Sequence, residues 1–89
     1  GDVLILTKPL GSGALLAAWM SGDCKAAWFD AMLPWLVTAN KSAWEVFAAL
    51  GVTAATDVTG FGLAGHLLEM LQASGVSARL FPKDVPVYE

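Results

Sequence analysis

Basic residues and cysteine are scarce in this sequence of 89 residues. Lys and Arg together number 5, they form no cluster, and the formal net charge is −3, so nucleic-acid binding has no electrostatic support. A single cysteine, Cys24, cannot form an internal disulfide and fits a reducing, cytoplasmic setting. No apolar stretch approaches the roughly 20 residues that a membrane helix needs. We therefore expect neither a nucleic acid nor a membrane as a partner.

Apolar residues are abundant: 56% of the chain is hydrophobic and 15% is charged, against about 45–50% and about 25% in ordinary soluble domains. This composition argues against disorder. A short chain this apolar leaves apolar surface uncovered, and such surface usually marks an interface. We expect self-association, or cover from another part of a larger protein. Because Val3 begins a β-type run with no start signal, we interpret residues 1–89 as a single partial domain.

Hydrophobic periodicity predicts the elements. Short apolar, partly β-branched runs at 3–7, 52–56 and 76–81 predict strands. Apolar spacing of three and four residues predicts helices over 12–20, 26–50 and 60–73. Within 26–50, Pro34 indicates a break or kink, or a helix that starts just before it. The predicted order is β-α-α-β-α-β, an α/β (α+β) fold with helices packed on a small mixed sheet.

The segment 56–66 carries the candidate site. Asp57 ends a predicted strand, and Thr59, Gly60 and Gly62 lead into a predicted helix. Glycines allow a sharp turn, a helix N-terminus attracts anions, and a carboxylate beside a phosphate suits Mg²⁺. Asp and Thr are also common helix caps, so a purely structural role for Asp57 and Thr59 stays open. His66 could orient a ligand, but we expect a helical histidine bonded to backbone or water.

A second interpretation uses the same glycines. Gly60, Gly62 and Gly65 form G-x-G-x-x-G, the dinucleotide-binding fingerprint. The acidic residue downstream, Asp84, follows Pro82 and does not end a predicted strand, which weakens this alternative. A non-catalytic interaction domain, using the apolar surface, is the third hypothesis.

The motif also resembles a known family. The run Thr56-Asp-Val-Thr-Gly-Phe-Gly-Leu63, with Gly65-His66 and Glu69-Met70, is similar to the second-domain motif of the selenophosphate synthetases (selenide, water dikinases) of the aminoimidazole ribonucleotide synthetase superfamily. Collinear similarity continues in Leu6–Gly13, from Met32 to Ala43, and in Ala73–Val76.

This resemblance implies a parent enzyme that converts selenide, ATP and water to selenophosphate, AMP and phosphate, using Mg²⁺ and a monovalent cation. Such enzymes have two α/β domains and dimerise through the first, which supplies the catalytic residues and most metal ligands. By resemblance, Asp57 is a metal ligand and residues 1–89 hold no catalytic residue. The glycine turn before the helix adds Thr59, Gly60 and Gly62 as cofactor-binding residues. We therefore expect an N-terminal ATP and metal domain outside these residues, and no synthetase activity from them alone.

Overall fold

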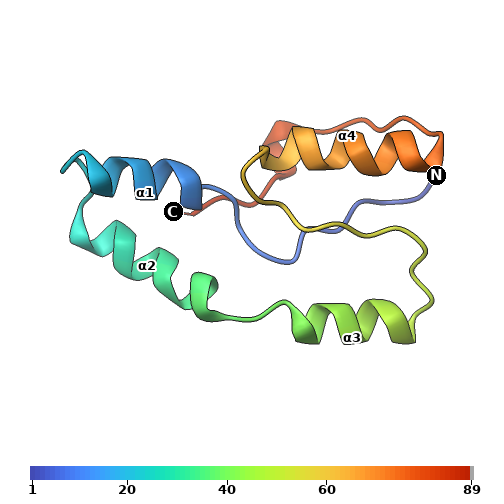
Figure 1. Cartoon of the computed structure of the whole chain (residues 1–89), viewed down its shortest axis with the longest axis horizontal. Coiled ribbons are helices and arrows are strands. Elements are labelled where there is room, and N and C mark those ends of the chain that lie inside the picture. The colour runs from blue at the N-terminus through green and yellow to red at the C-terminus, as the bar shows by residue number, and fades with distance from the viewer. Residues whose placement is uncertain (89) are drawn as a thin grey trace. The chain divides into compact units, whose positions relative to one another are not determined.

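The computed structural model describes residues 1–88, which form four α-helices and one short 3₁₀ helix (Figure 1). In chain order these are α1 (Ser12–Met20), α2 (Ala26–Val37), α3 (Lys41–Ala49), α4 (Gly62–Ser74) and η1 (Pro82–Asp84). The chain divides into two compact units: Gly1–Lys41 with the segment from Phe81 on, and Ser42–Leu80. Among residues 1–88, no helix combines the length and the apolar character needed to cross a membrane.

Helix boundaries follow local chain chemistry. Gly75 ends α4 in the left-handed conformation (φ 66°, ψ 33°), and its N–H bonds the carbonyls of Leu71 and Gln72. The helix predicted over 12–20 is confirmed as α1, and that over 60–73 as α4. The stretch 26–50 forms two helices, because the chain leaves the helical conformation at Thr38 and not at Pro34. The Thr38 hydroxyl donates a 2.7 Å hydrogen bond to the Pro34 carbonyl, which satisfies an acceptor in the last turn of α2.

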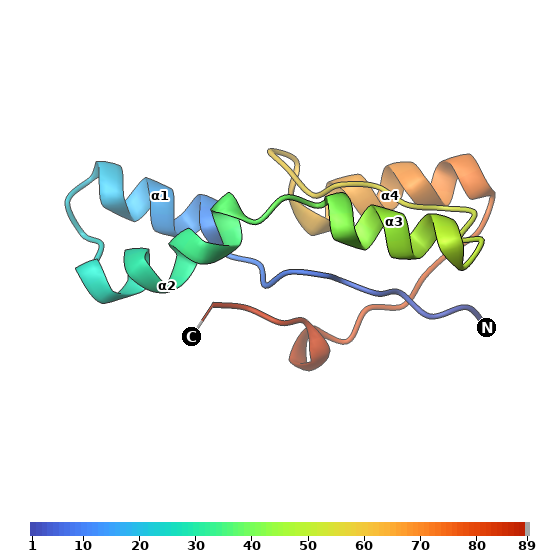
Figure 2. The same cartoon turned by 90° about the horizontal axis from the view of Figure 1, so that it is seen from below.

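In the first unit, α1 and α2 pack side by side (Figures 1 and 2). The ring centroids of Trp19 and Phe29 lie 4.7 Å apart, and Met32 of α2 is fully buried. The segment after η1 returns to the start of α1, where Leu10 and Val87 form an isolated parallel bridge. There the Leu10 N–H donates to the Pro86 carbonyl at 2.8 Å, so the first unit joins distant parts of the sequence.

The second unit contains α3 and α4. On α4, Leu67 is buried, and Leu63 and Met70 are half-buried, so the apolar residues spaced three and four apart on this helix face inward. On α3, the apolar residues are only partly covered. Phe47 is half-buried, whereas Trp44 is 64% exposed.

The predicted α/β (α+β) fold is wrong. Over residues 1–88 the chain forms no sheet, and its β-type pairing is limited to the isolated bridge at Leu10. The stretches 3–7, 52–56 and 76–81 contain no strand, and their apolar side chains are largely exposed, as at Val3 (81%) and Ile5 (72%). An apolar, β-branched run shows that a segment favours burial on a pleated surface. It does not supply the partner strand whose backbone groups must pair with it.

Candidate functional site

The candidate site is the turn that leads into α4. The Gly62 N–H donates to the Thr59 carbonyl at 3.0 Å, which closes the turn immediately before the helix. Phe61 is the N-cap residue of α4, and no side chain caps the helix there. The alternative in which Asp57 or Thr59 caps this helix is therefore wrong. The first N–H groups of α4 remain without a side-chain partner at the cap.

Asp57 is exposed, and its carboxylate makes no hydrogen bond or ion pair with any residue from 1 to 88. Its neighbour Thr56 bonds the Asp57 backbone carbonyl and not the side chain. A carboxylate with no protein partner keeps all of its acceptor positions available to a ligand. This is the arrangement that a metal ligand or a solvated surface aspartate would show.

Thr59 is connected to the helix through His66. The Thr59 Oγ1 and His66 Nε2 atoms lie 2.9 Å apart, within hydrogen-bond distance. His66 is buried, with 8% of its surface exposed, and its Nδ1 lies 3.8 Å from a carboxylate oxygen of Glu69. The partner of His66 is thus a side chain of the candidate site, and not the backbone or water that we expected. The sequence gives only a weak signal for this pair, a threonine before the helix and a histidine in its second turn.

Phe61 packs over the same histidine. The two ring centroids are 5.3 Å apart with an interplanar angle of 32°. Gly65 makes this packing possible, because a Cβ at position 65 would lie 2.8 Å from the Phe61 Cβ. The glycine at position 65 therefore has a steric function in this structure, and needs no dinucleotide to explain it.

A metal ion at this turn would need ligands from elsewhere. No group of three or more His, Cys, Asp or Glu side chains that could hold a metal occurs within the described part of the chain. One exposed carboxylate with a hydroxyl two residues later suits Mg²⁺, which commonly binds through one or two carboxylates together with water and phosphate oxygens. The residues present thus fit a part of a metal–phosphate site, to which they would supply one carboxylate and one hydroxyl.

The predicted site residues lie together in one turn. Asp57, Thr59, Gly60 and Gly62 all fall within the segment that enters α4, and Gly62 takes a positive φ of 73°. The dinucleotide alternative also needs a strand before this turn, and residues 52–58 contain none. Ligand binding by these four residues remains a prediction.

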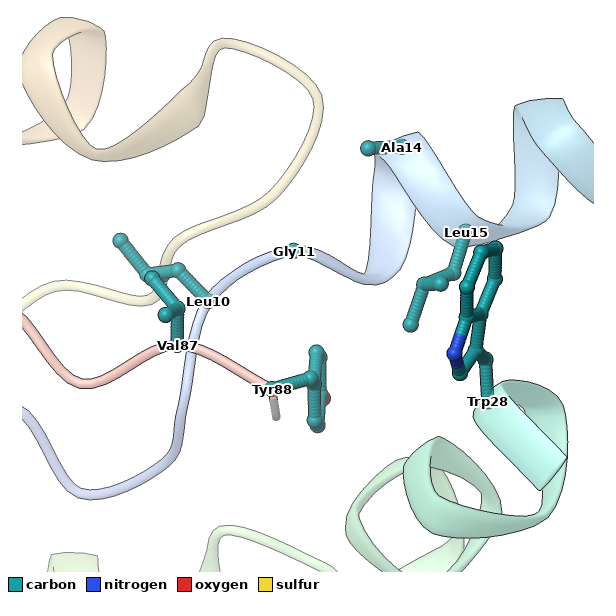
Figure 3. A pocket seen from close by; sticks show the side chains of 7 residues that line it. All are labelled: Leu10, Gly11, Ala14, Leu15, Trp28, Val87 and Tyr88. Carbon is teal, nitrogen blue, oxygen red and sulfur yellow. The ribbon is translucent and has the colours of Figure 1, made fainter.

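A separate apolar pocket lies within the first unit (Figure 3). It has a volume of about 420 Å³. Figure 3 shows that the Trp28 ring of α2 and the Tyr88 ring both line the pocket. The rest of its lining comes from the start of α1 and the bridge, namely Leu10, Gly11, Ala14, Leu15 and Val87. The Lys25 ammonium lies 5.0 Å from the centre of the Trp28 ring, outside this lining. None of the predicted site residues contributes to the pocket.

Comparison with known proteins gives a consistent result. The family described as "AIR synthase related protein, C-terminal domain" matches residues 1–89. Proteins named "Selenide, water dikinase" match over nearly the whole chain. That of Nitratidesulfovibrio vulgaris (strain DP4) is 48% identical over 88 residues, that of Aeromonas hydrophila 49% over 89, and that of Clostridioides difficile 43% over 89.

The chain accounts for only part of each relative. The match covers 98% of this chain and 25% of the Nitratidesulfovibrio protein, and 100% of this chain and 26% of the Aeromonas protein. No solved structure matches the chain. The resemblance to selenophosphate synthetases that the sequence indicated is confirmed, and the chain belongs to the AIR synthase related proteins, within their C-terminal domain family.

Proposed function

We propose that this chain acts as a C-terminal-domain part of a selenide, water dikinase, an enzyme that converts selenide, ATP and water to selenophosphate, AMP and phosphate. The observation that carries the proposal is the 48% identity over 88 residues to a protein of that name, together with the turn at 56–66. Since the chain spans about a quarter of that relative's length, the remainder of the active site lies outside residues 1–89. We assign it to an N-terminal domain that carries the catalytic residues.

Asp57 is the metal ligand that this part of the enzyme supplies. Its exposed carboxylate has no protein partner among the described residues, and it stands five residues before α4. The N–H groups at the start of that helix carry a partial positive charge, which favours a phosphate group nearby. Mg²⁺, when bound with ATP, neutralises charge on the transferring phosphoryl group.

Thr59, Gly60 and Gly62 line the approach to the phosphates. Gly62 holds a positive φ, which lets the backbone turn sharply and lets a ligand come close. In this proposal the complete enzyme is a cytoplasmic homodimer that also uses a monovalent cation. Residues 1–89 alone are inactive, because the catalytic groups and the other metal ligands belong to the N-terminal domain.

A chimera tests the proposal directly. Residues 1–89 would replace the matching quarter of the Aeromonas hydrophila protein, to which they are 49% identical. We expect the chimera to form AMP from ATP only when selenide is present. In this chimera, Asp57→Asn should lower Mg²⁺-dependent turnover by about 10²–10³-fold, the usual loss when one electrostatic contact to a transition state is removed.

Asp30→Asn is the matched control. Asp30 is an exposed aspartate on α2, and its substitution removes the same charge far along the sequence from the turn. We expect turnover within about twofold of the unsubstituted chimera for Asp30→Asn, as for most surface changes. Equal turnover of the two variants would refute the metal role of Asp57, and a folded chimera that forms no AMP would refute the proposed function.

A further inference from the structure

His66 is the buried polar side chain of α4, and both of its ring nitrogens face oxygen atoms. Nε2 lies 2.9 Å from Thr59 Oγ1, and Nδ1 lies 3.8 Å from Glu69 Oε2. The His66 side chain is 10% exposed. In a neutral imidazole one nitrogen carries a proton and the other accepts one, so the tautomer decides which way the bond to Thr59 points.

The position of Glu69 favours one tautomer. A separation of 3.8 Å is too long for a hydrogen bond, but the negative carboxylate still favours an N–H over a lone pair at the nearer nitrogen. With the proton on Nδ1, Nε2 is unprotonated and accepts a hydrogen bond from the Thr59 hydroxyl. The opposite tautomer would place the Nδ1 lone pair toward a carboxylate, which is unfavourable.

Packing holds the ring in this orientation. Phe61 covers the ring at a centroid distance of 5.3 Å, and Gly65 leaves the space that Phe61 needs. Because the ring is held between the turn and the helix, Nε2 stays next to Thr59, and the tautomer with its proton on Nδ1 sets the direction of the bond. In that tautomer the hydroxyl hydrogen of Thr59 points at His66 Nε2.

We propose that His66 is a positioning residue that makes Thr59 a hydrogen-bond acceptor toward its ligand. Because the Thr59 hydroxyl donates its hydrogen bond to His66, its oxygen offers only lone pairs to a ligand. Such an oxygen suits a divalent cation or the water molecules around it, and it cannot donate to a phosphate oxygen. The ligand class rests on the proposed function, whereas the direction of the Thr59–His66 bond does not.

The first test is the tautomer of His66 in the 89-residue chain, measured from the ¹⁵N chemical shifts of its two ring nitrogens. We expect a proton on Nδ1 and none on Nε2. Thr59→Val should shift the Nε2 resonance, while Thr53→Val, a matched change at an exposed threonine earlier in the same segment, should leave it unchanged. A proton on Nε2 would overturn the proposal.

Two substitutions at position 66 separate positioning from packing. His66→Gln keeps an acceptor that reaches roughly to the place of Nε2, and His66→Phe keeps a ring against Phe61 but no acceptor. We expect the Thr59 side chain to stay in one rotamer in His66→Gln and to average among rotamers in His66→Phe, as measured by three-bond couplings. The reverse order would show that His66 acts by packing alone. Amide spectra of α4 would show whether each variant folds. If His66→Phe unfolds, the tautomer measurement and the Thr59→Val variant decide whether His66 positions Thr59.

The ligand class is tested on the same chain with Mn²⁺ alone and with inorganic phosphate alone. One exposed carboxylate binds a divalent cation only weakly without the other ligands, so Mn²⁺ is used at millimolar concentration. We expect it to broaden the Thr59 methyl resonance, and Asp57→Asn to abolish the broadening. Broadening that is absent, or a Thr59 resonance that responds to phosphate and not to Mn²⁺, would overturn the acceptor role. These results do not depend on turnover, so a failure here is distinct from an inactive chimera.

Discussion

Gly65→Ala tests the packing of the site at the level of one methyl group. The new Cβ would lie 2.8 Å from the Phe61 Cβ, about 0.7 Å or more inside the ordinary carbon–carbon contact of about 3.5–4.0 Å. Overpacking of this kind costs about 1–3 kcal/mol. Alanine also favours a helix over glycine by about 1 kcal/mol, so we expect a net change between about zero and 2 kcal/mol of destabilisation.

Gly13→Ala provides the matched control. Gly13 lies in the first turn of α1, and an added Cβ there meets nothing within 4 Å. The helix-propensity gain then acts alone, and we expect about 0.5–1 kcal/mol of stabilisation of α1. The two identical substitutions should thus differ by about 1–3 kcal/mol. Native-state hydrogen exchange, read on the amides of α1 and of α4 separately, measures both effects. Equal stabilisation at the two positions would refute the steric role of Gly65.

Three further predictions concern the rest of the chain. Met32→Ala should destabilise the first unit by about 2–5 kcal/mol in thermal unfolding, since Met32 is 0% exposed, whereas Met20→Ala at an 82% exposed position should change stability by at most about 0.5 kcal/mol. Pro34→Ala should stabilise α2 by about 1–3 kcal/mol, because it restores a backbone donor inside the helix; slower amide exchange in α2 would show this, and unchanged exchange would contradict it. The exposed side chains of Val3 and Ile5 should promote concentration-dependent self-association in sedimentation velocity, and a monomer at high concentration would count against it.

The helices were predictable because their signals are local. Apolar residues recur every three or four positions along α4, where Leu67 is buried, and the glycine after Ser74 ends that helix. Strands could not be predicted in the same way, because a strand is stable only when another segment pairs with its backbone. The apolar run at 3–7 has no such partner within the described residues, so the same residues that favour a sheet remain exposed.

The family and the turn were predictable from the sequence, whereas the hydrogen bond between side chains of the site was not. The order of Asp57, Thr59 and the glycines is visible in the linear sequence, and so is the helix that follows. The bond between Thr59 and His66 depends on the two side-chain rotamers and on the burial of the ring. Small changes in the turn decide whether a hydroxyl and an imidazole seven residues apart come within hydrogen-bond distance. Composition and spacing therefore cannot predict whether this hydrogen bond forms.

The steric and the hydrogen-bonding features of the turn are physically connected. A methyl group at position 65 displaces Phe61, and Phe61 is the ring that covers His66. If Phe61 holds the imidazole in place, Gly65→Ala should loosen the hydrogen bond between His66 and Thr59 even though the new methyl group meets Phe61 and not Thr59. The Thr59 couplings should then average in Gly65→Ala and remain those of a single rotamer in Gly13→Ala. A Thr59 that keeps one rotamer while α4 loses stability would show that the histidine is held by its own hydrogen bond and by the burial around Leu67, and that the glycine serves the helix alone.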